Sequence, residues 1–198
     1  MLNDLVQESP LADIEAEIAK ACGSLAGCFQ LTERPFVTLV TLRGTGVAFE
    51  SAVQRALGLT LPQRSGGRSA AGERVALWMG PDEWLIQSTQ DMAADLERHL
   101  RASLEGLRCA VVDVSSGYTV IDIAGSAVRD VLASGCPLDL HPSVFGDGQC
   151  AQSHFFKAGV TLCRDGDERF QLIVRRSFAE YCCLMLLDAV QPYLASYI

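Results

Sequence analysis

The sequence lacks both an excess of positive charge and a long run of apolar residues. Its 198 residues include 16 lysines and arginines against 24 aspartates and glutamates, a formal net charge of −8. Because phosphate groups are bound by basic surfaces, this balance argues against nucleic acid and against an anionic membrane surface as partners. No stretch approaches the roughly 18 uncharged apolar residues of a membrane span. We therefore expect neither nucleic acid nor membrane as a partner.

A secretory signal is also missing from the pattern. The first residues, MLNDLVQE, are acidic where a signal peptide is basic, and no apolar stretch follows them. Eight cysteines without an export signal are typical of reduced thiols in the cytosol. Two of them, Cys182 and Cys183, are adjacent, and neighbouring residues are poor disulfide partners. The sequence predicts a cytoplasmic protein.

What the sequence does contain is a clear alternation of helical and strand patterns. Helices are expected over about 10–22, 90–104 and 178–194, with shorter ones over about 47–57 and 126–132. Strands are expected at 36–42, 75–79, 84–87, 109–114, 118–123, about 151–157, 159–163 and 169–175. Residues 58–74, with Pro62 and several glycines, are expected to form a loop.

This order predicts an α+β fold, because strands joined mostly by hairpins form mostly antiparallel sheets. The helices and strands fall into two halves that resemble structural repeats, although no sequence repeat is present. We divide the chain into an N-terminal extension, 1–30, and a single α+β domain, 31–198. The extension contains a helix that Ser9 and Pro10 can begin.

The last predicted helix is apolar around most of its circumference. One apolar row runs from Phe178 to Ala189 and a second from Cys183 to Leu194, with Glu180 among the few polar residues. A helix of this kind must be covered on more than one side.

Two cysteines and two histidines form the best candidate set for a metal: Cys136, His141, Cys150 and His154. Thiolates and imidazoles are the ligands of tetrahedral zinc, and strand alternation places Cys150 and His154 on one face. However, the C-x4-H and C-x3-H spacings lack the usual C-x2-C pair, and cysteine is common in protein cores. We therefore assign no metal ligand.

Nucleophilic and nucleotide-binding motifs are equally weak. A cysteine could pair with His99, His141 or His154, but no local signature surrounds a cysteine. Gly44-Thr-Gly46 follows a strand and opens a helix, yet Phe49 stands where a dinucleotide-binding loop has its third glycine. We interpret this segment as a tight turn with Thr45 as the helix N-cap.

Charged residues within the predicted strands could also act chemically. Asp113 and Asp122 could serve as acid and base if buried together. The alternatives are a solvent-facing position or a hydrogen bond to a turn hydroxyl such as that of Ser115. Arg175 and Arg176 could hold a carboxylate, or form ordinary surface ion pairs. We assign no catalytic and no cofactor-binding residue.

Five segments, taken in order, resemble the gamma subunit of heterotetrameric sarcosine oxidase. They are Gly80–Leu85 (GPDEWL), Val112–Gly117 (VDVSSG), Gly135–Pro142 (GCPLDLHP), Phe145 with Gly148–Gln152 (GQCAQ), and Val174–Tyr181 (VRRSFAEY). The resemblance runs from roughly residue 35 to the C-terminus, and before residue 30 it rests only on Ser9-Pro10-Leu11. It implies a fold akin to the folate-binding domain of the glycine-cleavage aminomethyltransferase.

The resemblance also implies a complex of four different chains. That complex demethylates sarcosine oxidatively to glycine, reduces oxygen to hydrogen peroxide and passes the one-carbon unit to tetrahydrofolate. In the family the alpha chain binds NAD and folate, the beta chain binds FAD, FMN lies between them, and the delta chain holds zinc. No cofactor is implied for this chain.

We therefore expect a non-catalytic structural subunit whose partners are the alpha, beta and delta chains, mainly alpha. The apolar last helix and the arginine-rich loops would form the interface. Two alternatives remain: a stand-alone folate-dependent aminomethyl or one-carbon transferase, and the gamma chain of a related N-methyl amine oxidase.

Overall fold

The computed structural model describes residues 7–25 and 27–196 of the chain. Its helices are η1 (Ala12–Ile14), α1 (Glu15–Ser24), α2 (Val47–Leu57), α3 (Ala93–Ser103), η2 (Ser115–Gly117), α4 (Val128–Ala133), η3 (Arg176–Phe178), α5 (Ala179–Val190) and η4 (Gln191–Ser196). Its strands are β1 (Gln30–Arg34), β2 (Thr38–Gly44), β3 (Arg68–Ala71), β4 (Arg74–Gly80), β5 (Glu83–Ser88), β6 (Cys109–Asp113), β7 (Tyr118–Ala124), β8 (Cys150–Phe155), β9 (Ala158–Arg164) and β10 (Arg169–Arg175). Among these residues no helix is long and apolar enough to cross a membrane.

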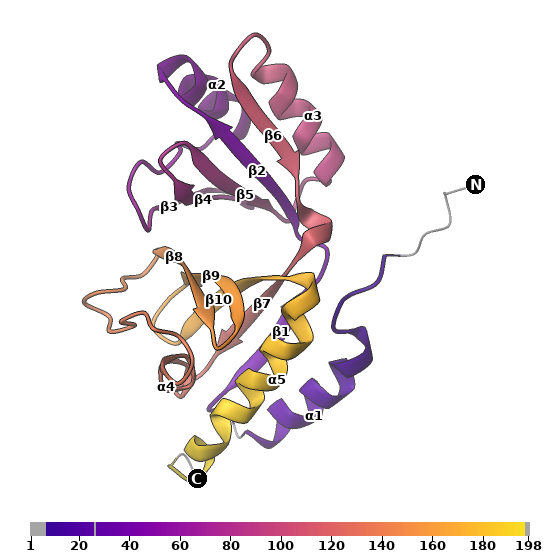
Figure 1. Cartoon of the computed structure of the whole chain (residues 1–198), viewed down its shortest axis with the longest axis vertical. Helices are drawn as coiled ribbons and strands as arrows, with labels where there is room; N and C mark the ends of the chain where they lie inside the picture. The colour runs from indigo at the N-terminus through magenta and orange to yellow at the C-terminus, as the bar shows by residue number, and fades with distance from the viewer. Residues whose placement is uncertain (1–6, 26, 197–198) are drawn as a thin grey trace.

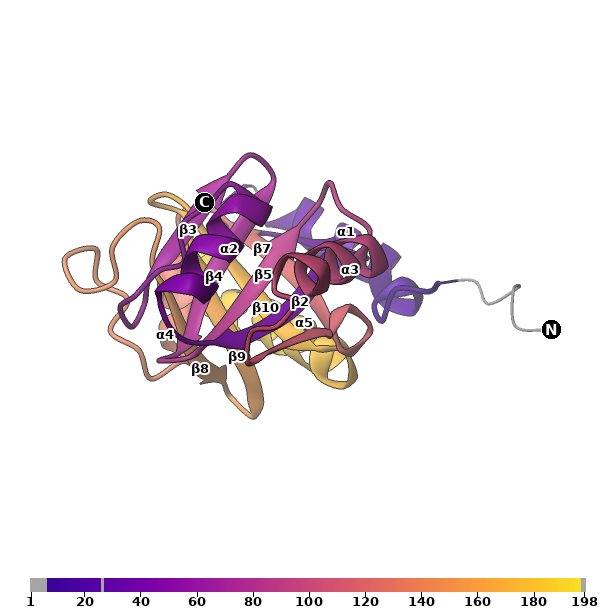
Figure 2. The same cartoon turned by 90° about the horizontal axis from the view of Figure 1, so that it is seen from above.

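The strands form two five-stranded sheets that stack face to face (Figure 1). Sheet I has the order β3-β4-β5-β2-β6 and sheet II the order β1-β7-β10-β9-β8, with antiparallel pairing throughout the described residues. Helices α2 and α3 cover the outer side of sheet I, where Figure 2 shows them from above. Helices α1, α4 and α5 lie on the outer side of sheet II (Figure 1). The predicted α+β fold with antiparallel sheets is confirmed.

The two halves share one topology. Each begins with an interior strand and a helix, continues with a three-stranded meander, and then adds a second helix: β2-α2-β3-β4-β5-α3 and β7-α4-β8-β9-β10-α5. In sheet I the fifth position, next to β2, is filled by β6. In sheet II the equivalent position, next to β7, is filled by β1 from the start of the chain. The second half is therefore completed by residues that precede the first half.

Alternating side chains place apolar residues on both faces of each sheet, which creates three apolar clusters. Sheet I packs on α2 and α3 through residues such as Leu42, Phe49 and Leu100. Sheet II packs on α1, α4 and α5 through residues such as Leu172 and Leu186. A third cluster lies between the sheets: Val37, Leu39, Leu77, Leu85, Val120, Cys150, Cys163 and Ile173.

Helix α5 is covered on more than one side, as its composition predicted. Its buried residues are Ala179, Cys182, Cys183, Leu186, Leu187 and Val190, all within the cluster beneath sheet II. Sheet II lies on one side of the helix, and α1 and α4 also contact it. Most of its apolar rows are therefore covered by this chain itself, whereas Phe178 is 40% exposed, and the expectation that the helix forms an interface with another chain stays a prediction. The side chain of Leu194 lies outside the described ones.

Three features of the strand order differ from the sequence-based expectation. Strand β1 was not predicted, and β3 lies inside the segment 58–74 that was expected to be a loop. The strands β6 and β7 are not neighbours: η2 carries the chain from sheet I into sheet II. A Ser-Ser-Gly turn is compatible with either a hairpin or a crossing, so local sequence could not distinguish them.

Helix ends also differ in detail. The N-cap of α2 is Gly46, at φ 97°, rather than Thr45. The helix expected over about 90–104 begins later, as α3, with the exposed Met92 at its N-cap. The expected helix over 10–22 is present as η1 and α1, preceded by a turn in which Ser9 Oγ accepts a hydrogen bond from the Leu11 amide.

The N-terminal segment contributes Leu11, Ile18 and Leu25 to the cluster beneath sheet II. The division into an extension, 1–30, and a domain, 31–198, stays a prediction, and residues 1–6 lie outside the described part.

Candidate functional site

The space between the two sheets is the best-defined candidate site. Apolar side chains fill its centre, and open cavities flank that centre. The larger of the two, about 430 Å³, is bounded on one side by Thr41, Glu83 and Leu85 of sheet I. On its other side lie Tyr118 and Arg175 of sheet II. The site is built by strand ends from both halves of the chain.

The polar groups of this cavity are a carboxylate, a guanidinium, hydroxyls and an amide. The guanidinium of Arg175 lies 5.3 Å from the centre of the Tyr118 ring, a cation–π geometry. Gln152 Nε2 donates to the Met79 carbonyl at 2.7 Å, which ties β8 to β4. Neither a cysteine nor a histidine lines the cavity within the described residues. This arrangement can bind a polar group between the sheets, but it presents no nucleophile with an adjacent base.

The four candidate zinc ligands are dispersed. Cys136 is buried with its Sγ 3.6 Å from Ser153 Oγ, whereas His141 is exposed and its Nδ1 lies 2.7 Å from Ser143 Oγ. Cys150 and His154 do lie on one face of β8, as alternation predicted, but Cys150 is buried between the sheets and His154 is exposed. Throughout the described residues no three His, Cys, Asp or Glu side chains converge on a possible metal position.

The candidate histidine on α3 has a structural contact. His99 Nε2 lies 3.2 Å from the Ala56 carbonyl, so this side chain joins α3 to the last turn of α2. The adjacent cysteines on α5 are buried, and burial raises the pKa of Cys182 to about 12 and also raises that of Cys183. Thiols held protonated in this way are poor nucleophiles.

The glycine segment between β2 and α2 is explained by packing. A Cβ at Gly44 would lie 2.4 Å from the Phe49 ring, and Phe49 is buried under sheet I. Glycine is therefore needed at position 44 because of the Phe49 ring. Phe49 is also the residue that departs from the dinucleotide-binding pattern.

Asp113 and Asp122 do not lie side by side, because β6 and β7 belong to different sheets. Asp113 accepts hydrogen bonds from Ser115 N–H at 2.9 Å and from its hydroxyl at 2.6 Å, which is the turn role considered as the alternative. Asp122 pairs with Arg34 at 2.8 Å, and burial raises its pKa. An acid–base pair is not formed.

Arg175, the last residue of β10, and Arg176, which follows it, form no ion pair among the described residues. Arg175 stacks on Tyr118, and Arg176 donates a hydrogen bond to the Glu8 carbonyl. Arg176 thereby ties the start of the described chain to the junction between the sheets.

Sequence reasoning missed a partly buried polar network at the end of sheet I. Arg74 forms two hydrogen bonds with Asp91, at 2.7 and 2.8 Å, and Ser88 Oγ donates to the same carboxylate at 2.7 Å. These hydrogen bonds, chiefly that from Arg74, lower the pKa of Asp91 to about 2. No sequence signal marks the pair, because 17 residues separate the partners.

The segment Gly135–Pro142 has a structural explanation as well. A Cβ at Gly135 would lie 2.5 Å from the Phe156 ring, and the Gly135 carbonyl accepts the Phe156 amide at 2.8 Å. Arg129 donates to the Leu140 carbonyl at 2.9 Å, and the buried Arg164 donates to the Phe145 carbonyl at 2.7 Å. Fixed arginines thus hold this loop by its backbone.

The fold and this site define a class of protein: an α+β chain of two antiparallel sheets, with the fold of aminomethyltransferase T. The glycine cleavage system aminomethyltransferase T from Bartonella henselae is similar in structure, with a TM-score of 0.62 at 13% identity over 92% of this chain and 57% of that one. A chain of the heterotetrameric sarcosine oxidase from Corynebacterium sp. U-96 is more similar, with a TM-score of 0.88 at 29% identity over 96% of this chain and 97% of that one.

Comparison of the sequence with known proteins identifies the family to which the chain belongs. The model for the sarcosine oxidase, gamma subunit family matches residues 43–191. The sarcosine oxidase subunit gamma of an Arthrobacter species is 35% identical over 196 residues, covering 96% of both chains. This chain belongs to the sarcosine oxidase gamma subunit family.

Proposed function

We propose that this chain is a non-catalytic structural subunit of a cytoplasmic, heterotetrameric sarcosine oxidase. The complex converts sarcosine to glycine with formation of hydrogen peroxide and methylene-tetrahydrofolate. Its FAD, FMN, NAD, zinc and folate are bound by the other chains. The observation that carries this proposal is the near-complete match, in both directions, to one chain of a heterotetrameric sarcosine oxidase.

The candidate side chains form contacts within this chain, which supports a structural role. Asp113 is hydrogen-bonded in a turn, His99 bridges two helices, and the arginines around Gly135–Pro142 bind backbone carbonyls. Groups held in such contacts stabilise the fold and are not available to a substrate. Two of the segments that resemble the family's sequence, Val112–Gly117 and Gly135–Pro142, are in this way explained by turn and loop geometry.

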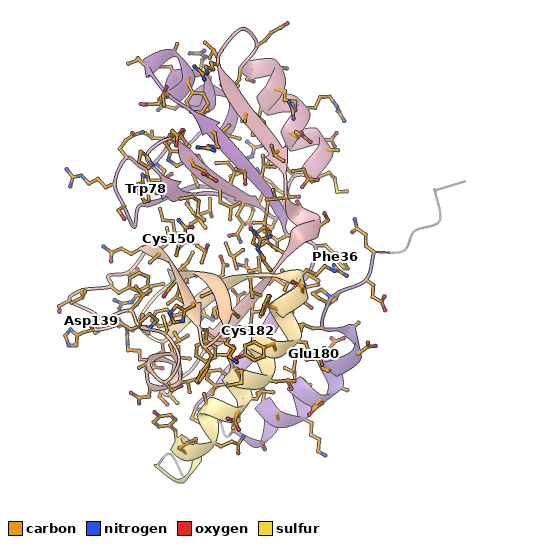
Figure 3. All side chains as sticks on the ribbon, in the orientation of Figure 1. Phe36, Trp78, Asp139, Cys150, Glu180 and Cys182 are labelled. Carbon is orange, nitrogen blue, oxygen red and sulfur yellow. The ribbon has the colours of Figure 1, made fainter. Side chains whose placement is uncertain are left out.

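A strained aromatic residue supports docking on the alpha chain. Phe36, in the turn between β1 and β2, has φ 60° and a side chain that is 56% exposed (Figure 3). A positive φ is costly for a bulky residue, and strain of this kind is concentrated at functional surfaces. Met92, which is 72% exposed, lines the same depression of about 480 Å³. We infer that Phe36 and Met92 contact the alpha chain.

Co-expression tests the proposal. The chain is expressed with and without the alpha, beta and delta chains, and sarcosine-dependent peroxide production is measured for each combination. We expect activity only in combinations that contain the flavin-binding chains, and loss of complex yield when this chain is omitted. Binding or turnover of tetrahydrofolate by the isolated chain would instead support the alternative, a folate-dependent one-carbon transferase.

The docking surface is tested with variants chosen to preserve the fold. Phe36→Asn removes the ring but keeps a residue that tolerates positive φ, and Met92→Ser places a good N-cap at the start of α3. The double variant is expected to weaken co-purification with the alpha chain at least about tenfold, since two exposed anchors are lost. Leu184→Ser, at a 40% exposed position of α5, is the matched control and is expected to co-purify normally.

A further inference from the structure

Two cysteines face each other across neighbouring strands of sheet II. Cys150 of β8 and Cys163 of β9 are register partners in the antiparallel pairing. The Arg164 amide donates to the Gln149 carbonyl at 2.9 Å, so the next pair along, Cys150 and Cys163, is a non-hydrogen-bonded pair. In such pairs the Cα atoms are about 4.5 Å apart, within the range of about 4.4–6.8 Å that a disulfide spans.

The surroundings of the pair distinguish the two sulfurs. Both residues are buried between the sheets, with 1% and 2% exposure. Cys150 Sγ lies 3.3 Å from the Gly67 carbonyl, and the Cys150 amide donates to the Gly66 carbonyl at 3.0 Å. The hydrogen bond between the two thiols lowers the pKa of Cys150 and raises that of Cys163. Cys150 is therefore the sulfur that more readily becomes a thiolate.

A small oxidant has a route to the Cys163 side of this pair, and Cys150 is the register partner of Cys163 on the next strand. Cys163 lines a cavity of about 200 Å³ between the sheets, together with Arg68 and Asp165. A cavity of this size holds several water-sized molecules. Figure 3 places Cys150 on the side of β8 that faces Trp78 of sheet I, so the pair lies at the junction of the two halves.

We propose that Cys150 and Cys163 form a redox-active dithiol, which a hydroperoxide converts to a cross-strand disulfide. The Cys150 thiolate attacks one oxygen of hydrogen peroxide, the O–O bond breaks, and Cys150 sulfenic acid and hydroxide form. The Cys163 sulfur then attacks the Cys150 sulfur and displaces the sulfenic oxygen as hydroxide. With the two thiol protons the balance is two thiols and one peroxide giving one disulfide and two waters.

The other cysteines provide a contrast within the same chain. Cys182 and Cys183 are adjacent on α5 and cannot bridge each other without distortion, and burial raises the pKa of both. Oxidation also has a local structural consequence, because the disulfide has no thiol proton to donate to the Gly67 carbonyl. The inference concerns this chain's own thiols and does not depend on the proposed function of the complex.

Peptide mapping tests the proposal on the folded full-length chain. The chain is treated with a small excess of hydrogen peroxide, its remaining thiols are alkylated, and it is digested with trypsin and a protease that cleaves before aspartate. These enzymes release residues 147–157 and 158–164, each with a single cysteine. We expect a linked pair of these two peptides, lighter by two hydrogen atoms than their sum, which reductant separates.

Comparison with the unfolded chain and with variants makes the test specific. The link is expected to form at least about tenfold faster in the folded chain than in urea, because the fold holds the two sulfurs in contact. Cys163→Ala is expected to abolish it, and Cys182→Ala, at an equally buried position, is expected to leave it unchanged. No linked pair in the folded wild-type chain, or a rate no higher than in urea, would overturn the proposal.

Discussion

The two halves of the molecule share a topology but differ in how their second helix is covered. Helix α3 over sheet I has only Leu96 and Leu100 buried among its 11 residues. Helix α5 over sheet II has six buried residues among 12. Helix α2 contacts α3 as α4 contacts α5, and α1 packs beside α5 in addition. The same position in a repeated topology therefore accepts an amphipathic helix where one other helix contacts it and a more apolar helix where two do.

The junction with the N-terminal residues also distinguishes the halves. Sheet I is built from one continuous segment, whereas sheet II needs β1 and rests on α1. Glu33 of β1 accepts a hydrogen bond from Thr119 of β7 at 2.5 Å and another from Ser9. The first half is complete in sequence, and the second is assembled from both ends of the chain.

Deletion of residues 1–25 should destabilise the second half of the molecule far more than the first, and this is the largest effect that we expect. It removes Leu11, Ile18 and Leu25, which are 2%, 7% and 1% exposed. At about 1.5–3 kcal/mol for each buried aliphatic side chain, the loss is about 5 kcal/mol or more. We expect a chain whose second half no longer folds, measured by urea denaturation and by hydrogen exchange in β7 and β10. Deletion of residues 1–6 alone keeps the three side chains and is the control.

The strand-to-helix turns of the two halves should respond differently to the same substitution. Gly125, after β7, has φ 123°, and a Cβ there would lie 2.2 Å from the Cys28 carbonyl oxygen. Gly46, after β2, has φ 97° and open space around it. Gly125→Ala should cost at least about 3 kcal/mol, since backbone must move, and Gly46→Ala about 1 kcal/mol from strain alone. Equal losses in thermal or urea denaturation would contradict the close approach at Gly125.

An acid-sensitive ion pair is expected to stabilise the first half alone. The Asp91 carboxyl has a pKa of about 2 in the fold, below the ordinary value of 3.8. A lowered pKa stabilises the fold above the ordinary value, and this contribution of about 2 kcal/mol disappears as the pH falls from about 4 to 2. Asp91→Asn should lower the free energy of unfolding by that amount at pH 7 and by little at pH 2, in urea denaturation. Asp167→Asn is the control in the second half, because its carboxylate is 90% exposed.

The smallest expected difference concerns the outer faces of α3 and α5. Ala94→Glu on α3 should change stability by less than about 0.5 kcal/mol, because the position is exposed. Ala189→Glu on α5 should cost about 1 kcal/mol, because Ala189 packs against the cluster beneath sheet II. A calorimetric comparison of the two melting temperatures checks this, and an equal tolerance would mean that α5 is less covered than its packing indicates.

The sequence predicted elements whose signal is local and failed where partners are distant. The hairpin β4–β5 was recognisable because Gly80-Pro-Asp-Glu is a turn between apolar strands. Strand β1 was missed because its residues, QLTER, carry one buried side chain, and only pairing with β7 makes it a strand. The Asp91–Arg74 pair and the Cys150–Cys163 pair were missed for the same reason. The cysteine pair is created by the register of β8 and β9, and the Arg74–Asp91 pair by the pairing of β4 with β5, which brings Arg74 beside the end of β5. Periodicity does not encode such pairings.

The candidate site shows the same limit. Alternation correctly placed Cys150 and His154 on one face of β8, but the burial of the side chains on that face varies along the strand. One end lies between the sheets and the other reaches solvent, so residues with the same phase have different surroundings. Which of two in-phase residues is buried depends on where the second sheet ends, and no feature of the strand itself shows this.

The place of β1 in sheet II has a consequence for how the chain is made. A ribosome releases β1 first, yet Gln30 must pair with Ala124 of β7, a strand synthesised after all of sheet I. The segment 38–113 contains every strand of sheet I and both of its helices, so the first half can fold while the second is still being translated. During that interval β1 has no β7 to pair with. Pairing between strands that are distant in sequence is slow, because a long loop must be closed first. The start of the chain is thus among the last parts of the protein to reach its place.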